Sequence, residues 1–178
     1  MSGTLLAYRG VLPKIGPRVF IAPSATVIGD TEIGEETNIW FNCTVRGDVH
    51  EIRIGRRVNL QDGSVVHVTG GRFGTYIGDD VTIGHMALIH ACTLEAGSFV
   101  GMKACVMDGA VVESGAMVAG GAVVTPGKRV PAGELWAGSP ARKMRDLSEA
   151  ERAGLTDTVG RYVALAADYL AAGIGVAG

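Results

Sequence analysis

The histidines are the residues of this chain with the clearest capacity for chemistry. Three of the four, His67, His85 and His90, fall within 24 residues. Three neutral imidazoles around a divalent ion, with one coordination position left open, form a hydrolytic site. Water bound there is acidified to a pKa of about 7, a value known from zinc enzymes in general. The alternative is three unrelated polar side chains on a protein surface. The elements that carry the histidines decide between the two.

The dominant feature of the chain is a six-residue repeat. An aliphatic residue, often followed by a small one, recurs at every sixth position in four blocks: Ile21, Val27, Ile33, Ile39 and Val45; Ile54, Leu60 and Val66; Ile77, Ile83 and Ile89; and Leu94, Val100, Val106, Val112, Val118 and Val124. This period is neither helical nor a simple strand alternation. It predicts a strand and a corner, three to each coil of about 18 residues, with coils about 4.8 Å apart. The expected fold is an all-β solenoid, a parallel β-helix. A β-sandwich, the alternative, would not keep one period so long.

The repeat also predicts the organisation of the chain as a single domain. We expect an N-terminal cap at 1–20, the β-helix at 21–136 and a C-terminal α-helix at 147–172. The period breaks near Asp48–Arg53, Thr69–Tyr76 and Ala91–Thr93. Ser148, followed three residues later by Glu151, has the pattern of a capping box, which marks the start of the helix.

The repeat predicts where the histidines lie. His67 and His85 are one coil length apart and should share a side, with His90 on the next face. Each is displaced by one or two positions from an inward aliphatic residue, so its side chain should point outward. Flat sheet faces are usually buried by association, and a three-sided prism favours threefold packing. We therefore expect the three imidazoles to meet at a subunit surface. His50 has no such company, and both plain solvation and a role in proton transfer are open for it.

Composition argues against several kinds of partner. A net charge of −2 with no basic run gives no footprint for nucleic acid. The apolar stretch Tyr162–Gly178 is interrupted by Asp168 and is too short to span a membrane, and Met1–Gly10 lacks the apolar stretch of a cleavable signal. The three cysteines fit no zinc-ribbon spacing and are typical of reduced, buried thiols. We expect a cytoplasmic protein.

The segments around the histidines resemble the signature of the γ-class carbonic anhydrase family. The matching segments are Arg46-Gly47-Asp48, Ile52-Arg53-Ile54-Gly55, Asn59-Leu60-Gln61-Asp62, His67, Gly84-His85 and Ile89-His90, and then Trp136-Ala137-Gly138-Ser139-Pro140-Ala141-Arg142-Lys143 before a helix with Tyr162 and Tyr169. The resemblance covers nearly the whole chain. Many acyltransferases share the repeat, whereas the combination of these motifs with three histidines is specific.

The resemblance implies a left-handed β-helix and a homotrimer with a metal ion at each subunit interface. His67 and His90 would come from one chain and His85 from its neighbour. Zinc is the implied metal, although iron or cobalt can occupy such sites, because imidazole ligands alone do not choose among them. The implied substrates are carbon dioxide and bicarbonate.

The same resemblance implies roles for further residues. Gln61 would hydrogen-bond the metal-bound hydroxide, and Asn59 would position the water or the substrate. Tyr162 resembles a tyrosine that approaches the metal pocket. Asn59 has an alternative as a corner residue that bonds the backbone. Gln61 follows the inward Leu60 as His67 follows Val66, so we expect both on one outward side.

Three charged residues are similar to the family's interface network. Arg46 and Asp62 resemble an interface ion pair, which Asp48 would join; all three could equally serve the trimer interface alone. The prototype members also carry an acidic loop whose glutamates shuttle protons. Here residues 68–72 contain no carboxylate, so hydration could be weak or absent.

The leading function is therefore reversible hydration of carbon dioxide by a metal-bound hydroxide. One alternative is an acyl-CoA thioesterase or acyltransferase of the hexapeptide-repeat superfamily. A plain acyltransferase needs a single histidine as its catalytic base, whereas this chain aligns three. The other alternative is a metal-stabilised scaffold or assembly subunit without turnover.

Overall fold

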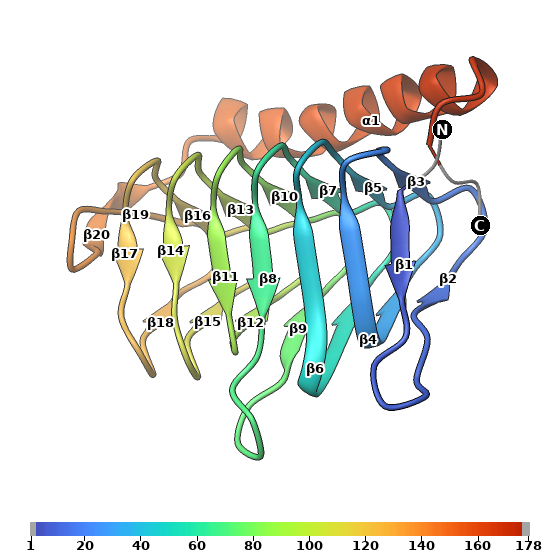
Figure 1. The fold of residues 1–178 in the computed structure, drawn as a ribbon. Helices are drawn as coiled ribbons and strands as arrows, with labels where there is room; N and C mark the ends of the chain where they lie inside the picture. The colour runs from blue at the N-terminus through green and yellow to red at the C-terminus, as the bar shows by residue number, and fades with distance from the viewer. Residues whose placement is uncertain (1–2, 176–178) are drawn as a thin grey trace.

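The fold class expected from the repeat is confirmed. In the computed structural model, which describes residues 3–175, the chain winds into a left-handed parallel β-helix with one C-terminal helix (Figure 1). Each coil contributes a short strand to each of three faces, and successive coils pair in parallel.

The three faces are named here by what they carry. The histidine face consists of β1 (Thr4–Leu6), the first parts of β4 (Thr26–Ile33) and β6 (Thr44–Ile54), β8 (Val65–His67), β11 (Leu88–His90), β14 (Cys105–Val106) and β17 (Val123–Val124). The helix face consists of β3 (Phe20–Ile21), β5 (Asn38–Ile39), β7 (Asn59–Leu60), β10 (Thr82–Ile83), β13 (Phe99–Val100), β16 (Met117–Val118) and β19 (Glu134–Ala137), with β20 (Arg142–Asp146) antiparallel at its edge. The third face consists of β2 (Lys14–Ile15), the ends of β4 and β6, β9 (Thr75–Ile77), β12 (Thr93–Leu94), β15 (Val111–Val112) and β18 (Arg129–Val130).

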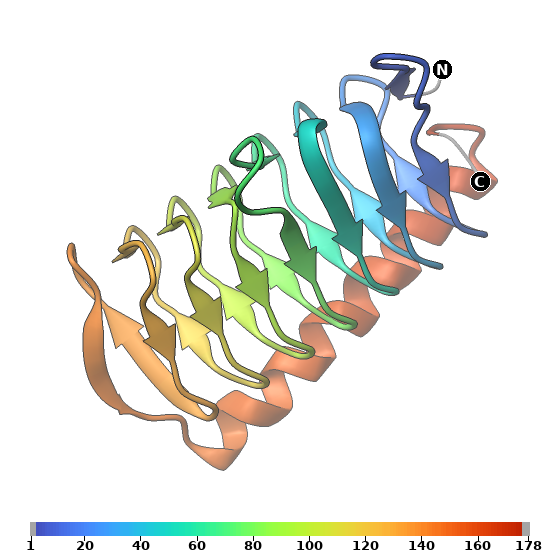
Figure 2. The same ribbon diagram turned by 90° about the horizontal axis from the view of Figure 1, so that it is seen from below.

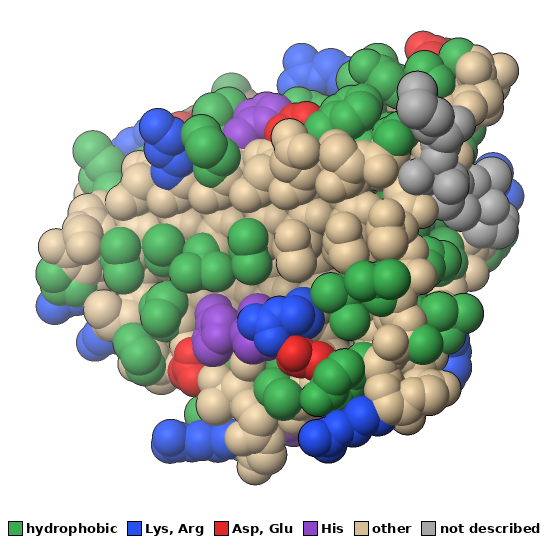
Figure 3. Space-filling view, in the orientation of Figure 1, with side chains coloured by type: hydrophobic (Ala, Val, Ile, Leu, Met, Phe, Trp, Pro, Cys, Tyr) green, Lys and Arg blue, Asp and Glu red, His purple; other side chains and the backbone are tan. Residues whose placement is uncertain are grey.

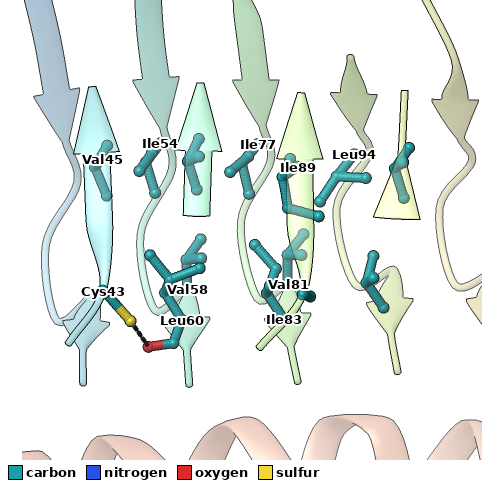
Figure 4. Close-up of a cluster of buried hydrophobic side chains, with 14 of the residues drawn as sticks. Cys43, Val45, Ile54, Val58, Leu60, Ile77, Val81, Ile83, Ile89 and Leu94 are labelled. Atoms are coloured by element: carbon teal, nitrogen blue, oxygen red, sulfur yellow. Dashed lines mark hydrogen bonds between the residues drawn. The ribbon is translucent and has the colours of Figure 1, made fainter. Parts of the chain in front are cut away.

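The core is a column of aliphatic side chains inside the coil. Every aliphatic residue that the repeat predicted to point inward is buried. Strand residues alternate in direction, so each inward residue has outward neighbours on either side. Figure 4 shows how the column stacks: Leu60 and Ile83 are neighbours on the helix face, and Val45 and Ile89 lie in the same row of the histidine face with one coil between them. Cys43 lies in the same interior, and its thiol contacts the carbonyl oxygen of Leu60 at 3.5 Å.

Two of the predicted breaks have different structural forms. Near Asp48–Arg53 the chain remains extended, and β6 continues round a corner from the histidine face to the third face with a register shift against β4. Near Thr69–Tyr76 the chain forms a loop between β8 and β9, which protrudes from the coil (Figure 1). A bridge between Thr69 and Phe73 closes this loop. Neither break disturbs the parallel pairing of the coils that follow.

The C-terminal helix α1 (Glu149–Ala171) runs along the coil over the helix face (Figure 2). The predicted capping box is present, with the side chains of Ser148 and Glu151 each bonded to the other's backbone N–H. The helix is anchored by aromatic contacts, in which the ring of Trp40 lies 5.5 Å from the rings of both Tyr162 and Tyr169. Because α1 covers the helix face, it limits the access of solvent and ligands to the outward side chains of that face.

The interior position of two thiols gives a first prediction. Burial raises the pKa of Cys43 and of Cys92 to about 12, so at pH 8 only about one such thiol in ten thousand is ionised. We expect Ellman's reagent at pH 8 to titrate at most one thiol per native chain and all three after unfolding in guanidinium. Cys105→Ser should leave none accessible in the native protein. Rapid reaction of two or more native thiols would show that the coil interior is open to solvent.

Candidate metal centre

Two of the three histidines stack on the histidine face. β8 and β11 pair in register so that His67 lies directly opposite His90. Both side chains point outward, and Nδ1 of His67 lies 3.3 Å from Nε2 of His90. The expectation that His67 and His85 share a side, with His90 on the next face, is wrong. The inserted loop after β8 lengthens that coil, so the residue one coil beyond His67 is 23 positions away instead of 18.

The second ring nitrogen of each stacked histidine contacts a carboxylate. Nε2 of His67 lies 3.1 Å from Oδ1 of Asp48, and Nδ1 of His90 lies 2.7 Å from Oδ1 of Asp108. An ionised carboxylate can only accept hydrogen bonds, so each ring donates a proton to its aspartate and keeps its other nitrogen as a lone pair. In these neutral tautomers the two lone pairs face each other across 3.3 Å. With both rings neutral there is no proton to share between these nitrogens, and a cation bound there would remove their repulsion.

The surroundings of Asp48, Asp108 and His67 favour the forms that metal binding requires, which are ionised carboxylates and a neutral imidazole. The pKa of Asp48 is lowered: partial burial acts to raise it, but hydrogen bonds from Arg46 and His67 outweigh that effect. The pKa of Asp108 is lowered chiefly by a hydrogen bond from Thr69. Partial burial lowers the pKa of His67, which favours its neutral form.

The distance between the two free nitrogens fits a metal ion. Two ligand nitrogens at 2.0–2.1 Å from a tetrahedral zinc ion lie about 3.3 Å apart, which matches the separation of the His67 and His90 nitrogens. A carboxylate behind each imidazole is also the usual arrangement around metal-bound histidines, because it fixes the tautomer and the ring orientation. The residues present therefore fit a metal ion, although within 3–175 no group of three His, Cys, Asp or Glu side chains forms a complete site.

The third histidine lies at another corner of the same chain. His85 follows β10 in the turn that leads from the helix face to the histidine face. Its Nδ1 lies 3.0 Å from Oδ2 of Asp62, so it too has a carboxylate at one ring nitrogen. Its backbone N–H donates to Oε1 of Gln61 at 3.2 Å. Gln61 therefore accompanies His85, and the expectation that it shares a side with His67 is wrong, because one repeat along the chain leads to the next face.

The remaining candidate residues are distributed around His85 and under α1. Gln61 and Tyr162 line a groove of about 460 Å³ between α1 and the helix face. The pKa of Tyr162 is raised by burial and by the nearby charge of Asp62. Asn59 is fully buried beneath α1, and neither of its amide atoms has a hydrogen-bond partner among the described residues. The alternative of a corner residue bonded to the backbone is thus not what the structure contains.

The expected charged network is only partly assembled in one chain. Arg46 pairs with Asp48 at 2.5 Å, while Asp62 contacts His85; within the described residues Arg46 forms no ion pair with Asp62. His50 accepts the backbone N–H of Glu51 through Nδ1 at 2.9 Å.

Comparison with known proteins identifies the family. The model for the bacterial transferase hexapeptide (six repeats) matches residues 13–47. A probable carbonic anhydrase from Methanocaldococcus jannaschii is 45% identical over 85% of this chain and 94% of its own length. The γ carbonic anhydrase 2, mitochondrial, of Arabidopsis thaliana is 46% identical over 86% of this chain, which spans only 57% of that protein. A crystal structure of a hexapeptide transferase family protein from Anaplasma phagocytophilum is 45% identical and has a TM-score of 0.90, covering 93% of this chain and 98% of that one.

The chain belongs to the γ-class carbonic anhydrase family. The resemblance carried by its motifs is thereby confirmed. One residue of the centre was missed by the sequence reasoning, namely Asp108. A signal for it existed, because Asp108 lies one coil length, 18 residues, after His90. Once His90 is placed on a strand face, the position one coil further is its neighbour.

The unpartnered amide of Asn59 gives a second prediction. A buried polar group without a partner costs about 1–3 kcal/mol of folding free energy, so Asn59→Leu should leave stability unchanged or increase it. Asn38, one coil away in the same register and equally buried, is the matched control. Its Oδ1 accepts from Nε1 of Trp40 at 2.8 Å, so Asn38→Leu should destabilise the protein. Chemical denaturation of both variants checks this; equal losses of stability would contradict it.

Proposed function

We propose that the protein catalyses the reversible hydration of carbon dioxide to bicarbonate at a metal ion held by three histidines. The observation that carries this proposal is the His67–His90 pair, whose free nitrogens face each other at 3.3 Å with a carboxylate behind each ring. Membership in the γ-class family supports the reaction, and several relatives bear the name carbonic anhydrase.

The third ligand in this proposal is His85 of a neighbouring subunit. His67 and His90 leave a tetrahedral site with two empty positions, and within one described chain no third ligand completes it. His85 lies at a different corner with its Nδ1 beside Asp62, which leaves its Nε2 for a metal. A homotrimer would bring the His85 corner of one subunit against the histidine face of the next. We propose zinc as the native ion, with iron or cobalt as ions that the same ligands can bind.

Features of the histidine face support subunit association. Matching positions of successive strands carry Val65, Leu88, Cys105 and Val123 outward, in one ladder beside the histidines. Figure 3 shows an apolar row crossing this side of the molecule, near a cluster of histidine, basic and acidic side chains. Arg46 and Asp62 have side chains that are 43% and 42% exposed. We propose that they form the intersubunit ion pair that the family resemblance implied, with Asp48 joining it.

When bound, a divalent metal in such a site supplies hydroxide at neutral pH for attack on carbon dioxide. The side chain of Gln61 is held by the backbone N–H of His85, and its amide NH₂ donates no hydrogen bond within the described residues. We propose that this NH₂ group orients the attacking oxygen or holds bicarbonate. A tyrosine is protonated at neutral pH, and the raised pKa of Tyr162 only reinforces this. We propose that Tyr162 donates to the same substrate. Asn59 is fully buried two residues before Gln61, so its part in positioning the water or the substrate would be indirect, through the strand that carries Gln61.

The expected cellular location and the expected absence of a nucleic-acid partner remain predictions. Among the described residues, no helix combines the length and apolar character needed to cross a membrane. The cytoplasmic location expected from the cysteines, and the absence of a nucleic-acid partner expected from the charge, rest on the sequence.

A second candidate function is hydrolysis of an acyl thioester at the same metal. The observation that favours it is the groove of about 460 Å³ lined by Gln61, Phe99, Met102 and Tyr162. This groove is far larger than carbon dioxide needs, and its apolar lining suits an acyl chain.

The proposed reaction gives a third prediction. Protein purified anaerobically should contain bound metal and hydrate carbon dioxide in stopped-flow assays. Chelation should abolish hydration and added zinc should restore it. His85→Ala should lose both metal and hydration, because two imidazoles cannot hold the ion alone, while His50→Ala should keep its metal.

Each alternative has its own outcome in the same samples. Metal-dependent acyl-CoA hydrolysis without hydration would favour the thioester reaction, and metal-independent acyl transfer would reject both. Loosening of the trimer on chelation, without any turnover beforehand, would favour a scaffold.

A further inference from the structure

Asp108 is held by hydrogen bonds on both of its carboxylate oxygens. One oxygen, Oδ1, accepts from Nδ1 of His90 at 2.7 Å, and the other, Oδ2, accepts from Oγ1 of Thr69 at 2.5 Å. The backbone around it is fixed as well: the Asp108 carbonyl accepts from the N–H of Gly127 at 2.8 Å, and the N–H of Gly109 donates to Ala91 at 2.7 Å. Asp108 therefore has little freedom to turn away from His90.

Thr69 contacts Asp108 from the start of the inserted loop. It lies at the start of the loop after β8 and is 39 residues from Asp108 in the chain. Two backbone hydrogen bonds with Phe73, of 3.0 and 3.1 Å, pin Thr69 in place. The ring of Phe73 lies against Gly109, where an added Cβ would meet it at 3.5 Å. The loop thus folds over the turn that carries Asp108.

The arrangement at His90 parallels the one at His67. Behind His67, Asp48 is fixed on its second oxygen by Arg46; behind His90, Asp108 is fixed on its second oxygen by Thr69. In each case a second donor prevents the carboxylate from rotating and so fixes the plane of the imidazole. Asp108 and Thr69, which hold His90, come from segments outside the motifs of the family signature.

We propose that Asp108, held by Thr69, is the positioning residue for His90: it sets the tautomer and orientation that present Nε2 of His90 to the metal. This inference rests on the proposed metal site. In this proposal the insertion between β8 and β9 has a structural role, because it carries Thr69, which holds Asp108. Carboxylates of this kind commonly change metal affinity by about 10–100-fold when they are removed.

The test measures cobalt affinity and spectrum, so it does not depend on turnover. Co²⁺ is titrated into metal-free protein, and its visible absorption bands report both affinity and ligand geometry. We expect Asp108→Ala to bind Co²⁺ about 10–100-fold more weakly, with altered bands. Asp108→Asn, whose amide oxygen can still accept from Nδ1, should lie between Asp108→Ala and wild type. Thr69→Ala should weaken binding, and Thr69→Ser, which keeps the hydroxyl, should restore it.

Two controls separate the possible failures. Asp79→Asn removes an aspartate that pairs with Arg56 on another part of the coil, and it should bind Co²⁺ as wild type does. His90→Ala should abolish binding. If His90→Ala abolishes binding but Asp108→Ala and Thr69→Ala bind Co²⁺ with unchanged affinity and bands, the role of Asp108 is refuted while the metal site stands. If His90→Ala binds as tightly as wild type, the metal site itself is refuted. Should Asp108→Ala fail to fold, Asp108→Asn and the Thr69 pair decide the question.

Discussion

Parallel pairing of successive coils places matching side chains one strand spacing apart, about 4.8 Å. Every feature of the proposed centre depends on this register. It puts His67 opposite His90 and brings their nearest ring nitrogens to 3.3 Å. The aliphatic column inside the coil enforces the register, because a slip of one residue would turn the inward residues Val66 and Ile89 outward. The burial that stabilises the fold thus also determines the geometry of the histidine pair.

The carboxylates convert this proximity into a site for a cation. Asp48 and Asp108 each accept from the outer nitrogen of one ring, which leaves two lone pairs facing a common point. Two facing acceptors are unfavourable by themselves, and the surrounding structure holds them in place. Arg46 and Thr69 restrain the carboxylates, and the β-helix restrains the rings. A rigid site of this kind loses little entropy when it binds an ion, which is the advantage of preorganisation.

The sequence predicted those features that follow from a strict period. Burial of residues such as Ile21 and Val124 follows from strand alternation alone, and the capping box at Ser148 follows from local chemistry. It was harder to predict which residues of neighbouring coils lie side by side. The register of His67 with His90 depends on how many residues the loop after β8 adds to its coil. The six-residue repeat does not predict that number.

Contacts between segments far apart in the chain were beyond the repeat as well. The prediction that Gln61 lies beside His67 assumes that equal positions in successive six-residue repeats share a side, whereas each repeat advances the chain to the next face. The contact of Asp108 with Thr69 spans 39 residues and depends on the folded shape of the loop. Residues that act through such contacts leave no local pattern. The family resemblance supplied the three proposed ligands and Gln61, but a resemblance carries over only the positions that its motifs contain.

The most direct test of the shared metal site is complementation between two defective subunits. His67→Ala and His85→Ala chains, each without tightly bound metal or hydration activity, are unfolded, mixed in equal amounts and refolded together. If each site takes His67 and His90 from one subunit and His85 from the next, every mixed trimer contains one intact site. Three quarters of randomly assembled trimers are mixed, so bound metal and hydration should recover to about a quarter of the wild-type level. A mixture that remains as empty and inactive as its two components would contradict a site built between subunits.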